Sequence, residues 1–199
     1  MSINQEVERI KTESTIYKTH IGVLKDSLKH IYIPDNGDIF EFGVYRGTSL
    51  KNILSFTQDN KIYAFDSFLG LPEAWSGARE HSYPKGHFST NGSLPNVVND
   101  RVTFVKGFFE DSLPEFLRSY NNNVSFIHID CDIYSSTKTI FNNMKPYIKS
   151  GTIILFDELI GYPDFELHEI KAWLEFVQET GIKYKYLYSA SEQVSLVIL

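Results

Sequence analysis

The strongest constraint on the fold of this chain is an alternation of short β-rich runs with segments of helical periodicity. Each run gathers β-branched and aromatic residues over a few positions, as strands do. Parallel strands need a long crossover connection, which is usually a helix. The alternation therefore predicts an α/β domain around a largely parallel sheet. The seven predicted strands are Asp38–Phe42, Lys61–Asp66, Arg101–Lys106, Val124–Asp130, Thr152–Asp157, Lys183–Tyr188 and Gln193–Leu199.

The last two predicted strands have a much shorter connection than the others. Only the short segment 189–192, which begins Ser-Ala-Ser, separates them, and it is too short for a parallel crossover. They should pair as an antiparallel hairpin. The expected sheet is therefore seven-stranded and mostly parallel, with an antiparallel C-terminal hairpin.

Capping residues predict where several helices begin and end. Thr48 or Ser49 can cap a helix after the first strand of the alternation. Ser112 opens a capping box whose helix would carry its proline in the first turn. A longer helix is expected over 164–180, with Gly181 at its end.

Two regions stand outside the alternation. Residues 1–33 have mixed charge and scattered apolar positions, and we expect an N-terminal helical cover or an oligomer contact, so that a homo-oligomer is possible. Residues 71–100 lack a clear period and are rich in proline and glycine. A connection of this length is more often a lid or substrate loop than an accident. Residues 34–199 then form a single domain.

Composition excludes several classes of protein. The chain has 199 residues, 42% of them hydrophobic, which suffices for one well-buried domain. Its apolar runs fall far short of the ~20 residues of a membrane span, and a net charge of −6 argues against a nucleic-acid partner. A lone Cys131 and an N-terminus without a signal peptide predict a cytoplasmic protein.

A glycine-bearing turn follows the first strand of the alternation. Gly43 and Gly47 allow close backbone approach before a helix N-terminus. Asp66 ends the next strand, where nucleoside-binding sheets place an acid on the ribose. Because the chain has neither G-x-G-x-x-G nor a phosphate loop, a nucleoside without a pyrophosphate is favoured. In the alternative interpretation the glycines only serve a tight connection and Asp66 caps a loop.

Three motifs carry a family resemblance. The segment 41–49 resembles the S-adenosylmethionine-binding motif of class I methyltransferases. The strings Phe-Asp-Ser-Phe-Leu-Gly-Leu-Pro at 65–72 and Asp-Cys-Asp-Ile-Tyr-Ser-Ser-Thr at 130–137 are similar to the macrocin O-methyltransferase family, whose members methylate sugar hydroxyls of natural products. The resemblance implies a Rossmann-like class I methyltransferase fold with helices on both faces of the sheet.

The same resemblance implies a cofactor site for S-adenosyl-L-methionine. Glu41 and Gly43 would lie along its methionine part, Asp66 would bind the ribose, and the segment 106–111 would flank the adenine. For Phe108 core packing is an equal alternative. The implied cofactor-binding residues are Glu41, Phe42, Gly43, Tyr45, Gly47, Ser49, Asp66, Ser67, Gly107, Phe108 and Asp130.

Two further predicted strands end in acids. Asp130 and Asp157 should meet at one sheet edge, because adjacent parallel strands share their carboxyl ends. Converging carboxylates repel one another unless a cation lies among them, and oxygen-rich sites suit Mg²⁺, Ca²⁺ or Mn²⁺. The resemblance implies Asp130, Asp157 and Glu158 as ligands, with Glu158 where the family more usually has Asp. Asp132 is expected only to cap the following helix.

These residues define the predicted chemistry. The leading hypothesis is a metal-assisted O-methyltransferase acting on a hydroxyl of a sugar or glycosylated small molecule, with Asp130 as the base. One alternative is a metal-independent enzyme using Asp130 or His168, and another is a silent binding module. His128 is expected to be a satisfied core residue and Cys131 to serve packing. Acceptor contacts are predicted for Arg79, His81, Tyr83, His87 and Phe88.

Overall fold

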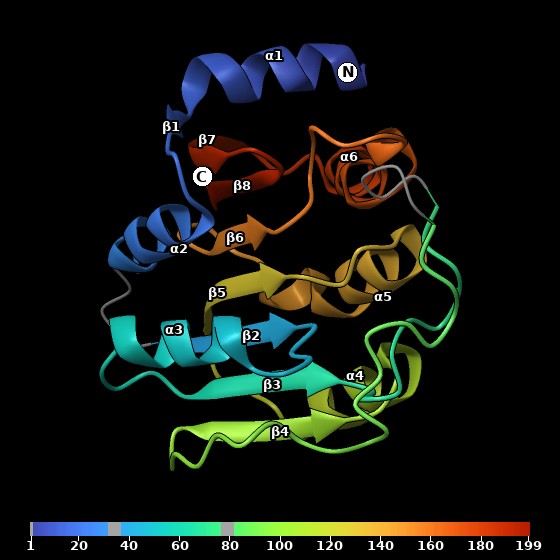
Figure 1. The fold of residues 1–199 in the computed structure, drawn as a ribbon. Coiled ribbons are helices and arrows are strands. Elements are labelled where there is room, and N and C mark those ends of the chain that lie inside the picture. Colours follow the sequence, from blue (N-terminus) through green and yellow to red (C-terminus); the bar gives the residue numbers. More distant parts are fainter. Residues whose placement is uncertain (1, 32–36, 77–81) are drawn as a thin grey trace.

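A computed structural model of the chain describes residues 2–31, 37–76 and 82–199. Within these residues, eight strands form one sheet in the order β1-β7-β8-β6-β5-β2-β3-β4 (Figure 1). The strands are β1 (Thr15–Ile16), β2 (Asp38–Phe42), β3 (Ile62–Asp66), β4 (Val102–Lys106), β5 (Val124–Ile129), β6 (Ile153–Phe156), β7 (Tyr184–Ala190) and β8 (Gln193–Ile198).

The predicted pairing of the strands is confirmed. Strands β2 to β6 pair in parallel, whereas β8 is antiparallel to both β6 and β7. The predicted strand count was wrong by one, because β1 adds to β7 through the pairs Thr15↔Tyr188 and Ile16↔Ser189. Two residues are too few to show a strand period, so this pairing depends on tertiary contacts.

Helices cover both faces of the sheet, as Figure 1 shows. Helices α2 and α3 pack on one face, and α4, α5 and α6 pack on the other. A buried apolar cluster lies on each side, one around Leu50, Ile53 and Phe126, the other around Phe40, Phe42 and Trp173. The helices are α1 (Ile3–Glu13), α2 (His20–Lys29), α3 (Thr48–Phe56), α4 (Phe109–Leu117), α5 (Tyr134–Met144) and α6 (Glu169–Thr180), with 3₁₀ turns η2 (Lys145–Tyr147) and η3 (Phe165–Leu167).

Three predicted helix starts were wrong. Gly47, in the left-handed region at φ 75°, caps α3 in place of Thr48 or Ser49. Helix α4 begins at Phe109, and the hydroxyl of Ser112 donates to the Phe108 carbonyl at 3.0 Å instead of capping. The helix expected over 164–180 is interrupted at His168, whose φ of −114° and ψ of −127° are not helical, so that α6 begins at Glu169 and the 3₁₀ turn η3 precedes it. The predicted end of α6 at Gly181, with φ 66°, is confirmed.

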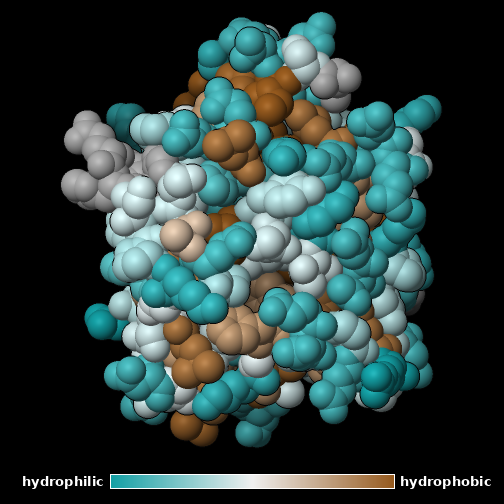
Figure 2. Space-filling model, turned by 90° about the vertical axis from the view of Figure 1, so that its right-hand side faces the viewer, coloured by the Kyte–Doolittle hydropathy of each residue, from teal (hydrophilic) through white to brown (hydrophobic). Residues whose placement is uncertain are grey.

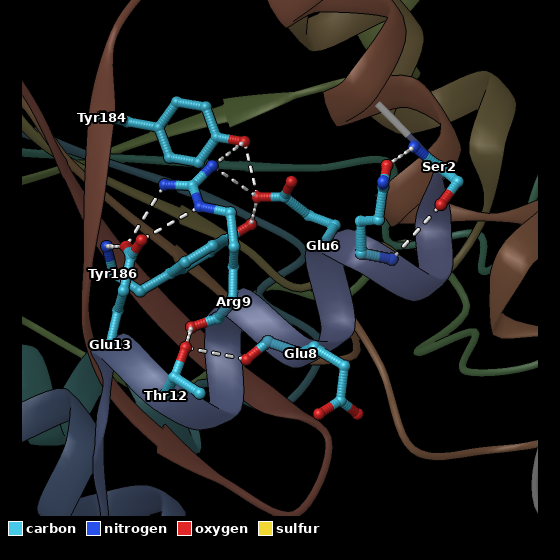
Figure 3. Close-up of polar contacts among 9 residues, drawn as sticks. Ser2, Glu6, Glu8, Arg9, Thr12, Glu13, Tyr184 and Tyr186 are labelled. Carbon is cyan, nitrogen blue, oxygen red and sulfur yellow. Dashed lines mark hydrogen bonds and ion pairs between the residues drawn. The ribbon is translucent and has the colours of Figure 1, made fainter.

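A buried carboxylate fixes helix α1 on strand β7 (Figure 3). Glu6 is fully buried, and its Oε1 accepts hydrogen bonds from the hydroxyls of Tyr184 and Tyr186, both at 2.6 Å. The guanidinium of Arg9 lies over the Tyr184 ring, 4.9 Å from its centroid, and bonds Glu13. Charge-assisted bonds of this kind are stronger than neutral ones. The N-terminal helix is therefore held on the sheet by polar as well as apolar contacts.

The long connection between β3 and β4 has little regular structure. In its described part, Trp75 and Tyr83 form an isolated antiparallel bridge, and no helix occurs. The serine hydroxyl of Ser135 on α5 donates to Glu73 at 2.6 Å, which attaches this connection to the domain. Among the described residues, no helix has the length and apolar character needed to cross a membrane.

Candidate functional site

A cavity of about 340 Å³ opens at the carboxyl edge of the parallel strands. Figure 2 looks onto this face of the molecule, where polar side chains alternate with paler and apolar ones. The cavity is within the size range of small-molecule sites. Its wall contains strand-end residues, acids and aromatic rings, among them Gly43, Tyr45, Asp66, Ser67, Trp75, Tyr83, Phe88, Phe108, Phe109, Glu110, Asp130, Asp132, Ser136 and Glu158.

The turn after β2 brings two strand ends into direct contact. Gly43 has a φ of 95°, and a Cβ added there would lie 1.6 Å from the carbonyl oxygen of Asp130. Only glycine fits this position. The sequence predicted that another group would approach the backbone of this turn closely, and at Gly43 that group is the carbonyl of Asp130 at the end of β5.

Asp66 holds the same turn from the end of β3. Its Oδ2 accepts hydrogen bonds from the amides of Val44 at 2.8 Å and Tyr45 at 2.7 Å. Its Oδ1 accepts from the Phe68 amide at 2.7 Å. Each carboxylate oxygen offers two lone pairs, so Asp66, which lines the cavity, keeps capacity for a further donor.

Three carboxylates meet in the cavity wall. Asp130, Asp132 and Glu158 each offer an oxygen within 4.8 Å of the others. The predicted capping role of Asp132 was wrong, because Ile133 is the N-cap of α5. Asp132 has a φ of 67°. Its side chain lies with the carboxylates of Asp130 and Glu158 and does not cap the helix.

These acids strongly affect one another. Burial raises the pKa of Asp132 to about 7, and the charges of Asp157 and Asp66 add to the shift. Burial and Asp157 likewise raise the pKa values of Asp130 and Glu158 well above their usual range. Oxygen Oε2 of Glu158 is buried without a hydrogen-bond partner. A divalent cation would relieve this repulsion, and an all-oxygen set suits Mg²⁺, Mn²⁺ or Ca²⁺.

Asp157 adjoins this group, since one of its oxygens lies within 4.8 Å of an oxygen of Asp130, but its other contacts differ. Its Oδ1 accepts a hydrogen bond from the side-chain amide of Gln193 at 2.5 Å and lies 3.8 Å from His128 Nε2. Burial opposes its ionisation, but His128 and Gln193 outweigh this effect and lower the pKa of Asp157 to about 2. Asp157 is not among the residues that line the cavity. The predicted ligand trio is thus divided between two neighbouring groups.

His128 is buried, as expected, but it is not a satisfied core residue. Its Nδ1 lies 3.5 Å from Glu41 Oε1, and neither ring nitrogen makes a hydrogen bond with acceptable geometry. Burial opposes protonation, but Asp157 and Glu41 outweigh it and raise the pKa of His128. Glu41 is fully buried and lies against His128 rather than in the cavity wall.

The other predicted base, His168, lies outside the cavity wall. It is 7% exposed, and its Nε2 lies 3.0 Å from the carbonyl oxygen of Ser76. Its ring packs against Trp75 and Tyr162. Burial lowers the pKa of His168, although the contact with Ser76 opposes the shift. The residue expected as an alternative base is therefore a buried contact of the long connection.

The remaining predicted cofactor residues divide into two sets. Tyr45, Ser67 and Phe108 line the cavity together with Gly43, Asp66 and Asp130, whereas Phe42, Gly47, Ser49 and Gly107 do not. The ring of Phe42 packs on Phe65 in the core with centroids 4.9 Å apart. Because successive side chains of a strand point to opposite faces of the sheet, a sequence motif alone does not show which of its residues face a ligand.

Aromatic residues of the long connection form another part of the wall. Of the predicted acceptor contacts, Tyr83 and Phe88 line the cavity, and His87 stacks on Tyr83 at 4.4 Å. Arg79 and His81 lie outside the described residues. Trp75, which was not among the predicted contacts, lines the cavity as well.

Asp132 was not predicted as a site residue. Its position in the string Asp130-Cys131-Asp132, directly after a strand that ends in an acid, was the sequence signal that could have indicated it.

Fold and cavity together define a Rossmann-like methyltransferase architecture, in which ligands bind at the carboxyl ends of the strands. Residues 40–159, more than half of the chain, match a family model described as a methyltransferase domain. The chain therefore belongs to this family of methyltransferase domains.

Curated relatives match the same part of the chain. It is 28% identical, over 61% of its length, to the 8-demethyl-8-(2,3-dimethoxy-alpha-L-rhamnosyl)-tetracenomycin-C 4'-O-methyltransferase of Streptomyces olivaceus. It is 24% identical, over 64% of its length, to demethyldecarbamoylnovobiocin O-methyltransferase of Streptomyces niveus. The matches cover 52% and 54% of those proteins, so the chain spans about half the length of the relatives it matches.

Solved structures share the fold. The O-methyltransferase NovP superposes with a TM-score of 0.67 at 18% identity, over 89% of this chain and 78% of NovP. The calicheamicin methyltransferase CalS11 also gives 0.67, at 19% identity, over 98% of this chain and 80% of CalS11. At these identities the comparison establishes the shared architecture.

Proposed function

We propose that this protein is an O-methyltransferase that moves the methyl group of S-adenosyl-L-methionine to a hydroxyl of a sugar-containing small molecule, assisted by a divalent cation. The observation that carries the proposal is that the glycine turn, Asp66 and the three carboxylates Asp130, Asp132 and Glu158 line one cavity. The names of the relatives, which include a rhamnosyl-tetracenomycin and a novobiocin precursor, support a glycosylated acceptor.

The donor half of the site is assigned to the strand ends of β2, β3 and β4. Asp66 would accept a hydrogen bond from a ribose hydroxyl with the one lone pair of Oδ1 that the backbone amides leave free. Phe108 and Phe109 would offer flat apolar surface to the adenine. Tyr45 and Gly43 line the same wall and would lie along the methionine part. Binding there would fix the reactive methyl group toward the acids.

The acceptor half is assigned to the three carboxylates and the aromatic wall. A bound cation would supply acidification of a hydroxyl that is nearly un-ionised at neutral pH. Asp130, Asp132 and Glu158 fit as its ligands because they converge, are crowded and repel one another. Asp130 would also take the hydroxyl proton as the methyl group leaves the sulfur for the oxygen. Trp75 and Tyr83 would orient the acceptor ring.

A methyl-transfer assay on a panel of glycosylated and unglycosylated hydroxyl compounds tests this function. We expect product only with S-adenosylmethionine and a glycosylated acceptor, and loss of activity in a chelator that Mg²⁺ or Mn²⁺ restores. Full activity in the chelator would support the metal-independent enzyme instead. Tight binding of the donor without turnover on any acceptor would support a silent binding module.

A further inference from the structure

Three buried polar side chains near the acceptor side of the cavity have atoms that make no hydrogen bond of acceptable geometry within the described part of the chain. These atoms are Nε1 of Trp75, the hydroxyl oxygen of Tyr162 and both carboxyl oxygens of Glu169. The exposed fractions of the three residues are 5%, 6% and 0%. Polar groups buried this deeply need partners. The three residues therefore call for an explanation that core packing does not supply.

The three side chains come from different elements and are neighbours in space. Trp75 belongs to the long connection, Tyr162 follows β6, and Glu169 is the first residue of α6. The rings of Trp75 and Tyr162 meet edge to face, with centroids 5.8 Å apart. Burial raises the pKa of the Tyr162 hydroxyl, the charge of Glu169 adds to the shift, and the indole of Trp75 opposes it as a hydrogen-bond donor. Tyr162 thus has both the indole and the carboxyl group as neighbours.

The donor and acceptor properties of the three groups are complementary. An indole N–H can only donate, a phenol hydroxyl can donate and accept, and a carboxyl group accepts in either charge state. A hydrogen-bond series in which Trp75 donates to Tyr162 and Tyr162 donates to Glu169 gives every member a partner. Such series strengthen each of their bonds when they are shielded from water.

Trp75 is the member of this series that lines the cavity. Its backbone is fixed independently, because it exchanges two hydrogen bonds of 2.9 Å with Tyr83. The next carbonyl, that of Ser76, lies 3.0 Å from Nε2 of His168. With the backbone held in this way, the series from Glu169 would determine the direction of the indole plane.

We propose that Glu169 is a positioning residue, which acts through the hydroxyl of Tyr162 to hold the indole of Trp75 in the orientation that an acceptor contacts. The inference rests on the proposed function, which assigns Trp75 to the acceptor half of the site. An indole offers a large flat surface, so turning its plane changes the fit of the acceptor. The donor is assigned to the ends of β2, β3 and β4 and is unaffected.

The rival role for Glu169 is electrostatic. Burial and the charge of Asp157 raise the pKa of Glu158, and Glu169 adds a smaller contribution, so its charge would act on the acids of the cavity wall. Two variants distinguish the roles. Glu169→Gln removes the charge and keeps an oxygen that accepts from Tyr162, whereas Glu169→Leu removes both.

Nuclear magnetic resonance of the indole N–H groups in the intact chain, with isotope-labelled tryptophan, tests the series without donor or acceptor. The two tryptophans are Trp75 and Trp173, and Trp75→Phe assigns their signals. We expect Glu169→Leu and Tyr162→Phe to shift the Trp75 signal and to speed its hydrogen exchange about tenfold. Glu169→Gln should leave it near the wild-type position. The signal of Trp173, which is fully buried in the core, should not move in any of these variants.

Kinetics with a glycosylated acceptor identified by the panel assay separate positioning from a general loss of structure. Glu169→Leu should raise the KM for the acceptor about tenfold and leave the affinity for S-adenosylmethionine unchanged, while Glu169→Gln stays close to wild type. Glu175→Leu is the matched control, because Glu175 lies on the same helix and accepts a hydrogen bond from Tyr134 at 2.8 Å. It should change neither the Trp75 signal nor the KM.

Far-UV circular dichroism shows whether each variant folds, and Tyr162→Phe, which loses only a hydroxyl, carries the test if Glu169→Leu does not fold. An unchanged Trp75 signal in folded Tyr162→Phe overturns the proposal. Equal effects of Glu169→Gln and Glu169→Leu also overturn it, in favour of the electrostatic role. If the Trp75 signal responds as expected but no acceptor is methylated, the positioning of Trp75 stands and the proposed function fails.

Discussion

The carbonyl oxygen of Asp130 lies against Gly43, only 1.6 Å from the place that a Cβ atom would take there. Any residue other than glycine at position 43 would therefore overlap with it. Because the turn after β2 and the acid at the end of β5 pack backbone against backbone, the glycine turn and the acids form one continuous part of the cavity wall. Changes on either side of this contact should affect the other.

Gly43→Ala should therefore both destabilise the protein and abolish binding in the cavity. We expect a loss of about 3 kcal/mol in the free energy of unfolding, from the steric overlap and the positive φ, measured by urea denaturation. Gly151→Ala is the control, because Gly151 also has a positive φ, 91°, but has nothing within 4 Å of an added Cβ. An equal loss in both variants would show that backbone strain, and not the contact with Asp130, decides the cost.

Asp66→Asn should weaken both the turn and donor binding. Asn has a single acceptor oxygen, so it cannot accept from the Val44 and Tyr45 amides and from the Phe68 amide at the same time. We expect S-adenosylmethionine affinity to fall at least about tenfold, which corresponds to about 1.4 kcal/mol, in isothermal titration calorimetry. Asp59→Asn on an exposed loop should leave the affinity unchanged. Wild-type affinity in Asp66→Asn would remove Asp66 from the donor site.

Stability without divalent cations should fall as the pH rises from about 4 to 7. The folded-state pKa of Asp132 is about 7, whereas its unfolded value is about 3.9. The folded protein binds more protons in this window, so raising the pH destabilises it, by up to about 4 kcal/mol from Asp132, and the raised pKa values of Asp130 and Glu158 act in the same direction.

Thermal denaturation in a chelator across this pH range measures the effect. Addition of Mn²⁺ at pH 8 should restore the melting temperature, and Asp132→Asn should flatten the profile. A profile that rises with pH in the chelator would contradict the crowding of carboxylates in the cavity wall.

Glu6→Gln should loosen helix α1 without affecting the cavity. The neutral amide replaces charge-assisted bonds from Tyr184 and Tyr186, so we expect a loss of about 1 to 2 kcal/mol in stability. The melting temperature should fall by a few degrees, about 2–4 °C per kcal/mol for a chain of this size. Glu8→Gln on the exposed side of the same helix is the control. Reduced donor affinity in Glu6→Gln would indicate that α1 contributes to the site.

Local patterns were sufficient for seven of the eight strands of the sheet and for its acidic edge. The runs ending in Asp66, Asp130 and Asp157 are mostly apolar, and their connections leave few topologies open. Capping was less predictable. Ser112 had the correct spacing for a capping box, yet Gly107, with a φ of 146°, ends the preceding strand early enough for α4 to begin at Phe109.

The sequence by itself determined that several carboxylates would gather at the carboxyl edge of the sheet. Tertiary structure alone decided which of them face the cavity. Asp132 enters the wall through a left-handed backbone at φ 67°, whereas Asp157 continues the face of β6 that carries Leu155 and meets His128 and Gln193. Strand periodicity is a local property, but the direction of a side chain beyond the last strand residue depends on neighbouring strands, here β5 and β8. The short pairing of β1 with β7 has the same origin.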